Sequence, residues 1–354
     1  MEYHPFSDLA WDVTEPQYRE DPALSYSTLS KYEREGRFRS IPSLREHIST
    51  PSLVFGSIVD ALTTGGYGEF DSLFTVADMP ELSENLEQIA RELFAIYGDS
   101  LVFKDIPEAN LAEVGKNCGY YAADKFEAYR VKLIKENCET YYNLLKASQG
   151  KTLISQKDYN DALACATKFR ESPFTSWYFS DLPYADDERT NINYYQLKFK
   201  GVDKNTGVEY RNMADILKIL PEEKLVIPCD VKTTSKPEED FYKSFLTYNY
   251  NLQARLYWRL IRKAMDKDEY YKDFKLANYR FLVINRNTLT PLVWEDNMTQ
   301  AVGEVRYQTK SGHLYTVRDP YVIGKELNDY RINQNEYPIT VGPINNITEF
   351  IQES

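Results

Sequence analysis

Two short β-type stretches carry the residues of this sequence that could do chemistry. The first, 213–220 (MADILKIL), contains Asp215, and the second, 225–232 (LVIPCDVK), contains Asp230 and Lys232. Residues two positions apart on a strand share one face. Asp230 and Lys232 are therefore expected side by side, an arrangement that suits a solvated edge strand or a site for a metal ion and a water.

A hairpin would bring the two acids together. The four residues Pro221–Lys224 form a common hairpin loop length, and the symmetric register places Asp215 directly opposite Asp230. Opposed Cβ atoms lie about 5 Å apart, where two carboxylates repel each other, and one pKa rises unless a cation lies between them. Pro228 resists this register, because proline cannot donate to the ladder and favours an edge or a bulge.

Two carboxylates and an amine around one point predict a divalent-cation site. Mg²⁺ prefers one or two carboxylates together with waters and phosphate oxygens. Such an ion acidifies and orients a water and stabilises charge on a phosphate, while Lys232 could position that water or neutralise the developing charge. Spacing alone leaves a solvated amphipathic hairpin as the alternative.

The surrounding elements predict a mainly helical first half and a second half of strands and helices. The first helix is expected at 25–36, with Ser27 as its N-cap and Gly36 just after its end. Further helices are expected at 51–66, 119–148, 155–172, 247–266 and 323–332, and strands at 213–220, 225–232, 279–287 and 290–297. This order indicates an α/β (α+β) fold, with helices packed on a central mixed sheet.

The composition is that of an acidic globular protein. The 354 residues are 42% hydrophobic and 14% aromatic, enough for one large or two ordinary domains. A formal charge of −12 excludes a surface that coats nucleic acid throughout but allows a local basic groove. The four cysteines form no C-x-x-C pair, and no membrane-length apolar run or signal-like N-terminus occurs. We therefore expect a cytoplasmic protein with no membrane association.

Three motifs in order resemble the PD-(D/E)XK nucleases, in particular the RecB-like branch with lambda exonuclease and RecE-type exonucleases. They are MADIL with Asp215, CDVKTT with Asp230 and Lys232, and YNLQARLYWRL with Gln253 and Tyr257. Gln253 and Tyr257 are four residues apart, on one helix face. The resemblance implies a restriction-endonuclease-like core with a helical N-terminal half.

The resemblance also implies a role for each motif residue. Asp215, Asp230 and the backbone carbonyl of Val231 would hold Mg²⁺ or Mn²⁺, Lys232 would orient the attacking water, and Gln253 would support this cluster or contact DNA. Four further residues are expected to contact DNA: Tyr257, Thr233, Thr234 and Ser27. Each of the four has an ordinary alternative, as a core tyrosine, a strand-end threonine or a helix N-cap.

Two upstream segments resemble the same family more loosely. FGSIVDAL (55–62) matches the FGSxxHxL helix of RecE-like proteins, with Asp60 where a metal-binding histidine would stand. Asp60 could bind Mg²⁺ directly or through water, or it could be a solvent-facing polar residue. SYSTL (25–29) matches an S-x-S-x-L segment that, in lambda exonuclease-like enzymes, helps to receive the DNA 5′ end, here through Ser27.

The resemblance suggests four parts of the chain. They are an N-terminal helical part (1–80), a helical insertion (81–152), the nuclease core (153–320) and a C-terminal helix and tail (321–354). No cysteines cluster near the C-terminus, so no iron–sulfur cluster is expected.

The implied activity is a metal-dependent deoxyribonuclease, most directly an exonuclease that processes double-stranded DNA ends in phage-type recombination or replication. Its expected partners are DNA, a single-strand annealing protein and further copies of the chain, in the host cytoplasm for a phage-encoded protein. The alternatives are a structure-specific endonuclease on the same core and a catalytically inactive DNA-binding or assembly protein. The intact set of Asp215, Asp230 and Lys232 favours catalysis.

Overall fold

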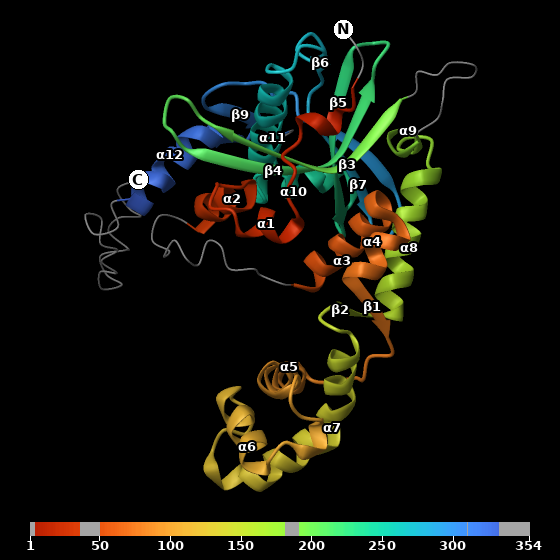
Figure 1. The fold of residues 1–354 in the computed structure, drawn as a ribbon, viewed down its shortest axis with the longest axis vertical. Helices are drawn as coiled ribbons and strands as arrows, with labels where there is room; N and C mark the ends of the chain where they lie inside the picture. Colours follow the sequence, from red (N-terminus) through yellow and green to blue (C-terminus); the bar gives the residue numbers. More distant parts are fainter. Residues whose placement is uncertain (1–3, 36–49, 181–190, 310, 333–354) are drawn as a thin grey trace. The chain divides into compact units, whose positions relative to one another are not determined.

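The computed structural model describes residues 4–35, 50–180, 191–309 and 311–332. The chain forms two compact units (Figure 1). One unit comprises Met1–Val54 and Thr167–Ser354, and the other comprises Phe55–Ala166. The expected insertion, 81–152, lies inside the second unit.

A six-stranded mixed sheet forms the centre of the first unit. Its strands are β3 (Ile192–Val202), β4 (Glu209–Leu220), β5 (Leu225–Thr234), β6 (Lys275–Leu276), β7 (Arg280–Asn285) and β8 (Pro291–Glu295). The order is β3-β4-β5-β7-β8, and β6 also pairs with β5. β5 runs parallel to β6 and β7, whereas the other pairs are antiparallel. The parallel pairing requires a crossover, which the helices between β5 and β7 provide.

The first unit also contains helices, as the sequence predicts. They are α1 (Glu15–Glu20), α2 (Tyr26–Glu35), α9 (Ser176–Phe179), α10 (Phe241–Thr247), α11 (Tyr250–Met265) and α12 (Pro320–Ile332), with short 3₁₀ turns at Phe6–Leu9 and Glu238–Asp240. α11 packs across β3 and β4 (Figure 1) because Leu252, Leu256 and Leu260 recur at helical spacing and are buried. The predicted class, helices on a central mixed sheet, is confirmed.

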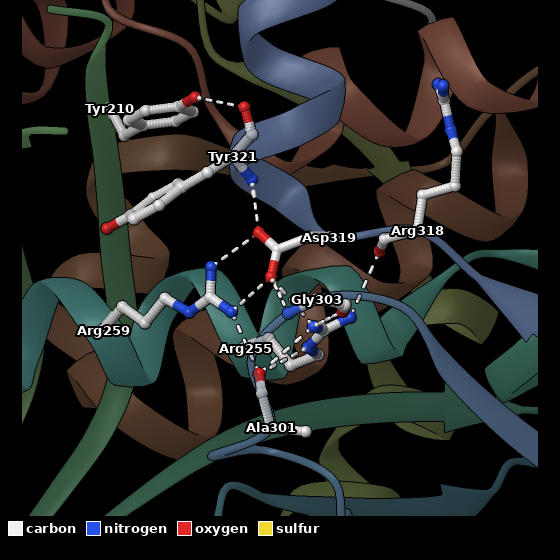
Figure 2. Close-up of polar contacts among 8 residues, drawn as sticks. All are labelled: Tyr210, Arg255, Arg259, Ala301, Gly303, Arg318, Asp319 and Tyr321. Carbon is white, nitrogen blue, oxygen red and sulfur yellow. Dashed lines mark hydrogen bonds and ion pairs between the residues drawn. The ribbon is translucent and has the colours of Figure 1, made fainter. Parts of the chain in front are cut away.

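A buried polar cluster anchors α11 through two of its arginines, Arg255 and Arg259 (Figure 2). Arg255 is fully buried and donates to the carbonyl oxygens of Ala301 and Gly303. Arg259 forms two hydrogen bonds of 2.7 and 2.6 Å to the Asp319 carboxylate, which Arg255 also reaches at 3.1 Å. These contacts tie α11 to the segment around the β9–β10 ribbon (Val305–Gln308 and Leu314–Val317).

The second unit is mainly helical. It contains most of α3 (Pro51–Asp60), a π-helical turn (Ala61–Gly65), α4 (Gly66–Leu73), α5 (Glu84–Tyr97), α6 (Glu108–Asn117), α7 (Glu127–Ala147), most of α8 (Gln156–Glu171), 3₁₀ turns at Phe103–Asp105 and Asp124–Phe126, and the parallel pair β1 (Phe74–Ala77) and β2 (Thr152–Ser155). Its core joins Ile89 and Leu93 of α5 to Ile134 and Tyr142 of α7.

Three expected helices differ in detail. The helix expected at 119–148 begins at Glu127, because Gly119 and Tyr121 have positive φ and interrupt it. The helix expected at 51–66 is α-helical only to Asp60, and a π-helical turn follows at Ala61–Gly65. Ser27 is not the N-cap of α2: the helix begins at Tyr26, and Ser25 Oγ accepts the Thr28 N–H at 3.4 Å. Gly36 lies outside the described residues.

In the part of the chain that the structure describes, no helix is both long enough and apolar enough to cross a membrane.

Candidate active site

The hairpin of β4 and β5 adopts the register that its symmetric loop predicts. Leu220 lies opposite Leu225, Leu217 opposite Pro228, and Ile216 opposite Cys229. The register is the same before and after Leu217–Pro228, so the proline introduces no bulge. The next position in this register places Asp215 opposite Asp230.

The two strands separate at the acids. Pairing between β4 and β5 ends at Ile216–Cys229, and from Cys229 onward β5 pairs with β7 on its other side. Where the strands part, the Val231 N–H donates to Asp215 Oδ2 at 2.9 Å. The Asp215 carboxylate of β4 thus binds the main chain of β5, next to Asp230 in sequence, where the two strands part; this place is called the fork below.

Asp230 lies at the centre of the cluster and is only 1% exposed. Gln253, which α11 brings over the sheet, donates from Nε2 to Asp230 Oδ1 at 2.5 Å. Lys232, two residues along the same strand, forms an ion pair with Asp230 Oδ2. Residues of β5 and α11 therefore contact one buried carboxylate, and Asp215 of β4 binds the N–H of the next residue along β5.

Lys232 is held as a cation. Burial disfavours its charge, but the negative charges of Asp230 and Asp215, together with nearby Tyr250 and Tyr26, outweigh burial and raise the pKa of Lys232 well above its usual range. An ammonium group at neutral pH can donate hydrogen bonds and balance negative charge, but it cannot accept a proton. The raised pKa favours a charged Lys232 side chain beside Asp230.

Tyrosine rings enclose this side of the cluster. The Lys232 ammonium lies 5.0 Å from the centroid of the Tyr250 ring. Tyr257 is 8% exposed, and its ring meets that of Tyr26 edge-on at 6.5 Å. Burial raises the pKa of the Tyr257 hydroxyl, and Tyr18, Asp230 and Asp215 add to this. The structure thus places Tyr257 in the core beside the acids, and its DNA contact stays a prediction.

The other expected DNA contacts lie at the edges of the site. Thr233 is half-buried and pairs with Ile284 of β7. Thr234 is buried, and its Oγ1 accepts the Lys236 N–H at 3.1 Å, so it shapes the turn after β5. Ser27 is exposed in the first turn of α2, 2.8 Å from Ser25 Oγ. Their contacts with DNA also stay predictions.

Asp60 lies in the second unit, at the end of α3. Its Oδ1 accepts a hydrogen bond of 3.4 Å from Thr64 Oγ1, and its carbonyl accepts one of 3.0 Å from the same hydroxyl. Its role as a metal ligand stays a prediction.

The donors at the fork fit a hard divalent cation. Among the described residues, no three or more His, Cys, Asp or Glu side chains gather as a metal-binding group. The carboxylates at the fork are those of Asp215 and Asp230, and their role as metal ligands stays a prediction. Mg²⁺ is commonly held by one or two carboxylates, and the all-oxygen set does not suit zinc. Gln253 Oε1 is buried there with no hydrogen-bond partner in the described part of the chain.

Sequence reasoning missed four residues that shape this site. Gln196 has φ of +54° within β3, and the flanking pairs Tyr195–Ile216 and Leu197–Ala214 place it opposite Asp215. A left-handed glutamine inside a strand carries backbone strain, which is common near functional sites. The other three are Tyr26, Tyr248 and Tyr250. Tyr248 and Tyr250 alternate with asparagine in TYNYN (247–251), just before Gln253, and this alternation is the sequence signal that could have found them.

Comparisons with known proteins leave the family of this chain open. No family model matches the sequence, and no curated protein matches it. Among solved structures, a protein from Eubacterium rectale described as a "Putative exonuclease" aligns with 92% of this chain and 85% of its own. The TM-score is 0.39 and the sequence identity 11%. Likeness at this level carries no argument about activity, which has to be argued from the site itself.

Proposed function

We propose that this protein is a metal-dependent nuclease with its active site at the fork between β4 and β5. The observation that supports it is that contacts of Asp215, Asp230, Lys232 and Gln253, from three elements, meet at neighbouring residues of β5. A buried carboxylate with an adjacent cation costs free energy to bury. A solvated amphipathic hairpin would have no reason to carry it, because Asp230 is almost completely buried.

Asp215, Asp230 and the carbonyl of Val231 would hold Mg²⁺ or Mn²⁺ at this fork. When bound, such an ion would supply Lewis acidity toward a phosphate oxygen and lower the pKa of a coordinated water. The protein supplies the positions. Gln253 holds one oxygen of Asp230, and the Val231 N–H holds one oxygen of Asp215, so both carboxylates are oriented before any ligand arrives.

Lys232 contributes a fixed positive charge. Its ammonium lies between Asp230 and the Tyr250 ring, in a largely dehydrated place where charge interactions are stronger than in water. It would orient the attacking water or stabilise the charge that develops on a phosphate in the transition state.

The substrate that we propose is DNA, and the reaction is removal of nucleotides from double-stranded ends. The support is the order of the three motifs that resemble RecB-like and lambda-type exonucleases. Processing of ends for phage-type recombination or replication, with a single-strand annealing partner and homo-oligomer formation in a host cytoplasm, belongs to the same proposal. A structure-specific endonuclease on the same core is the second candidate, because the fork itself does not select for an end.

The test is digestion of end-labelled linear duplex DNA and of a covalently closed circle, each with Mg²⁺, Mn²⁺ or EDTA. Lys232→Ala and Asp230→Asn serve as site variants. Lys224→Ala is the matched control, since Lys224 is an exposed lysine in the loop of the same hairpin. Circular dichroism melting confirms that each variant is folded.

Metal-dependent shortening of the linear DNA, with an intact circle and loss of activity only in the two site variants, supports an exonuclease. Cutting of the circle with the same residue dependence supports the endonuclease. If neither DNA nor RNA is cleaved with either metal by folded wild-type protein, the catalytic proposal is wrong, and a DNA-binding or assembly protein remains.

A further inference from the structure

Two tyrosines lead from the candidate active site to the surface. Tyr248 and Tyr250 flank the junction between α10 and α11, and their ring centroids are 5.7 Å apart. The inner ring, Tyr250, lies 5.0 Å from the Lys232 ammonium. The outer ring, Tyr248, is 44% exposed. An aromatic surface therefore begins beside Lys232 and ends in solvent.

The backbone between the two rings turns through a left-handed residue. Asn249 has φ of +56°, a conformation that asparagine adopts more readily than most residues other than glycine. Here, two hydroxyl groups of α2 converge on the preceding carbonyl. Tyr26 OH donates to the Tyr248 oxygen at 2.6 Å, and Ser30 Oγ donates at 2.8 Å. Two side chains of α2 therefore hold the turn that presents Tyr248.

The inner ring is also supported from behind. Tyr250 stacks on Phe281 of β7 with centroids 5.5 Å apart and on Phe241 of α10 at 6.2 Å, and both phenylalanines are buried. The outer ring has a cation beside it, because the Arg34 guanidinium lies 5.9 Å from the Tyr248 centroid. An exposed ring, a rigid mount and an adjacent guanidinium together fit a flat π-system that carries negative charge.

We propose that Tyr248, with Arg34 beside it, is a stacking site for a nucleobase of the strand whose phosphate lies at Lys232. This inference rests on the proposed nuclease function. Stacking on an exposed aromatic ring tolerates any base, and an arginine next to it can contact the same base or its phosphate. The ligand class is an unpaired nucleotide that lies next to the reacting phosphate.

The experiment measures kcat and KM for Tyr248→Ala and Tyr248→Trp on end-labelled duplex DNA. Tyr315→Ala is the matched control, because Tyr315 is an exposed tyrosine of β10. Tyr248→Ala is expected to raise KM by about 5- to 100-fold with kcat nearly unchanged, because stacking remote from the reacting bond contributes uniform binding. Tyr248→Trp, which keeps a large ring, is expected to restore KM.

A second arm uses substrates with an abasic site at each of the terminal nucleotides in turn. At one position, the abasic site is expected to weaken binding by the wild-type enzyme as much as Tyr248→Ala weakens binding of intact DNA. The same abasic site is expected to cause no further loss of affinity in Tyr248→Ala. The inference is overturned if Tyr248→Ala leaves KM unchanged, or if the two losses are independent at every position.

Failure of the nuclease proposal gives a different result. If the wild-type protein cleaves nothing, fluorescence anisotropy with a labelled single-stranded oligonucleotide in EDTA decides the stacking site alone. Weaker binding by Tyr248→Ala, but not by Tyr248→Trp or Tyr315→Ala, supports it. Equal binding by all of these proteins, or no binding by any, overturns it.

Discussion

The Asp215 carboxylate accepts the main-chain N–H of Val231 at 2.9 Å, one residue beyond the last pair of the β4–β5 ladder. This bond replaces the backbone pairing that the register would otherwise continue. It leaves the fork open while keeping the two strands joined. The same side chain therefore has a structural contact and a proposed role in metal binding, and substitutions can separate the two.

Asp215→Asn keeps an oxygen that can accept the Val231 N–H but removes the negative charge. We expect cleavage to fall by about 100-fold or more, with little change in the free energy of unfolding. Asp215→Ala also leaves the partly buried Val231 N–H without this acceptor, which costs about 1–3 kcal/mol or less. Initial rates on end-labelled DNA and urea unfolding measure the two effects. Full activity in Asp215→Asn would contradict a metal role for this carboxylate.

Gln253 orients Asp230 and is expected to act through it. Gln253→Ala removes the 2.5 Å hydrogen bond to Asp230 Oδ1, and loss of such a supporting partner typically lowers metal affinity or activity by about 10- to 100-fold. Calorimetric titration with Mn²⁺ and the cleavage rate should fall together. Gln300→Ala, at an exposed glutamine, is the control. Equal Mn²⁺ affinity in Gln253→Ala and Gln300→Ala would show that Gln253 does not support metal binding.

The sequence was sufficient to predict this hairpin because its constraints are local. Loop length fixes register, and the β-type residues of 225–232 fix the strand, so Asp215, Asp230 and Lys232 could be placed together. Pro228 argued against this register, yet the ladder continues on both sides of it.

The aromatic surroundings of Lys232 could not be predicted in the same way. Tyr26 reaches the Tyr248 carbonyl from 222 residues away in sequence, and no local pattern encodes such a contact. Gln196 is a similar case. Its left-handed backbone is enforced by the sheet around it, whereas glutamine itself gives no signal for positive φ. The expected N-cap at Ser27 was wrong by two residues because three hydroxyl residues, Ser25, Ser27 and Thr28, compete at the start of α2.

The two hydroxyl groups on the Tyr248 carbonyl are expected to be partly redundant. Tyr26→Phe or Ser30→Ala alone leaves one donor in place, so each should reduce the free energy of unfolding by about 0.5–1.5 kcal/mol. The double variant leaves the carbonyl without either donor and should lose more than the sum of the single losses. A double-mutant cycle by urea unfolding measures this coupling. Strictly additive losses would show that the two hydroxyls act independently.

Asp319 should make stability depend on acidic pH. Burial by itself would raise the pKa of this carboxyl, but hydrogen bonds and charge from Arg259, with the N–H groups of Tyr321 and Gly303, outweigh it and lower the pKa below its ordinary value. A group whose pKa is lower in the folded state contributes stability above its unfolded pKa, and this contribution is lost as pH falls through the folded pKa. The unfolding free energy should therefore decrease as the solution is acidified.

Asp319→Asn tests that contribution directly. Removal of the charge leaves Arg255 fully buried beside a neutral amide (Figure 2), and a broken buried pair costs about 3–5 kcal/mol. Urea unfolding of wild type and variant should differ most at neutral pH and converge in acid, where the wild-type carboxylate is itself protonated. Asp266→Asn is the control at the C-terminal end of α11, since the Asp266 carboxylate that pairs with Arg262 is exposed and the pair should contribute less than about 1 kcal/mol. A difference between Asp319→Asn and wild type that stays constant from neutral to acidic pH would show that packing, rather than the charge of Asp319, holds α11 in place.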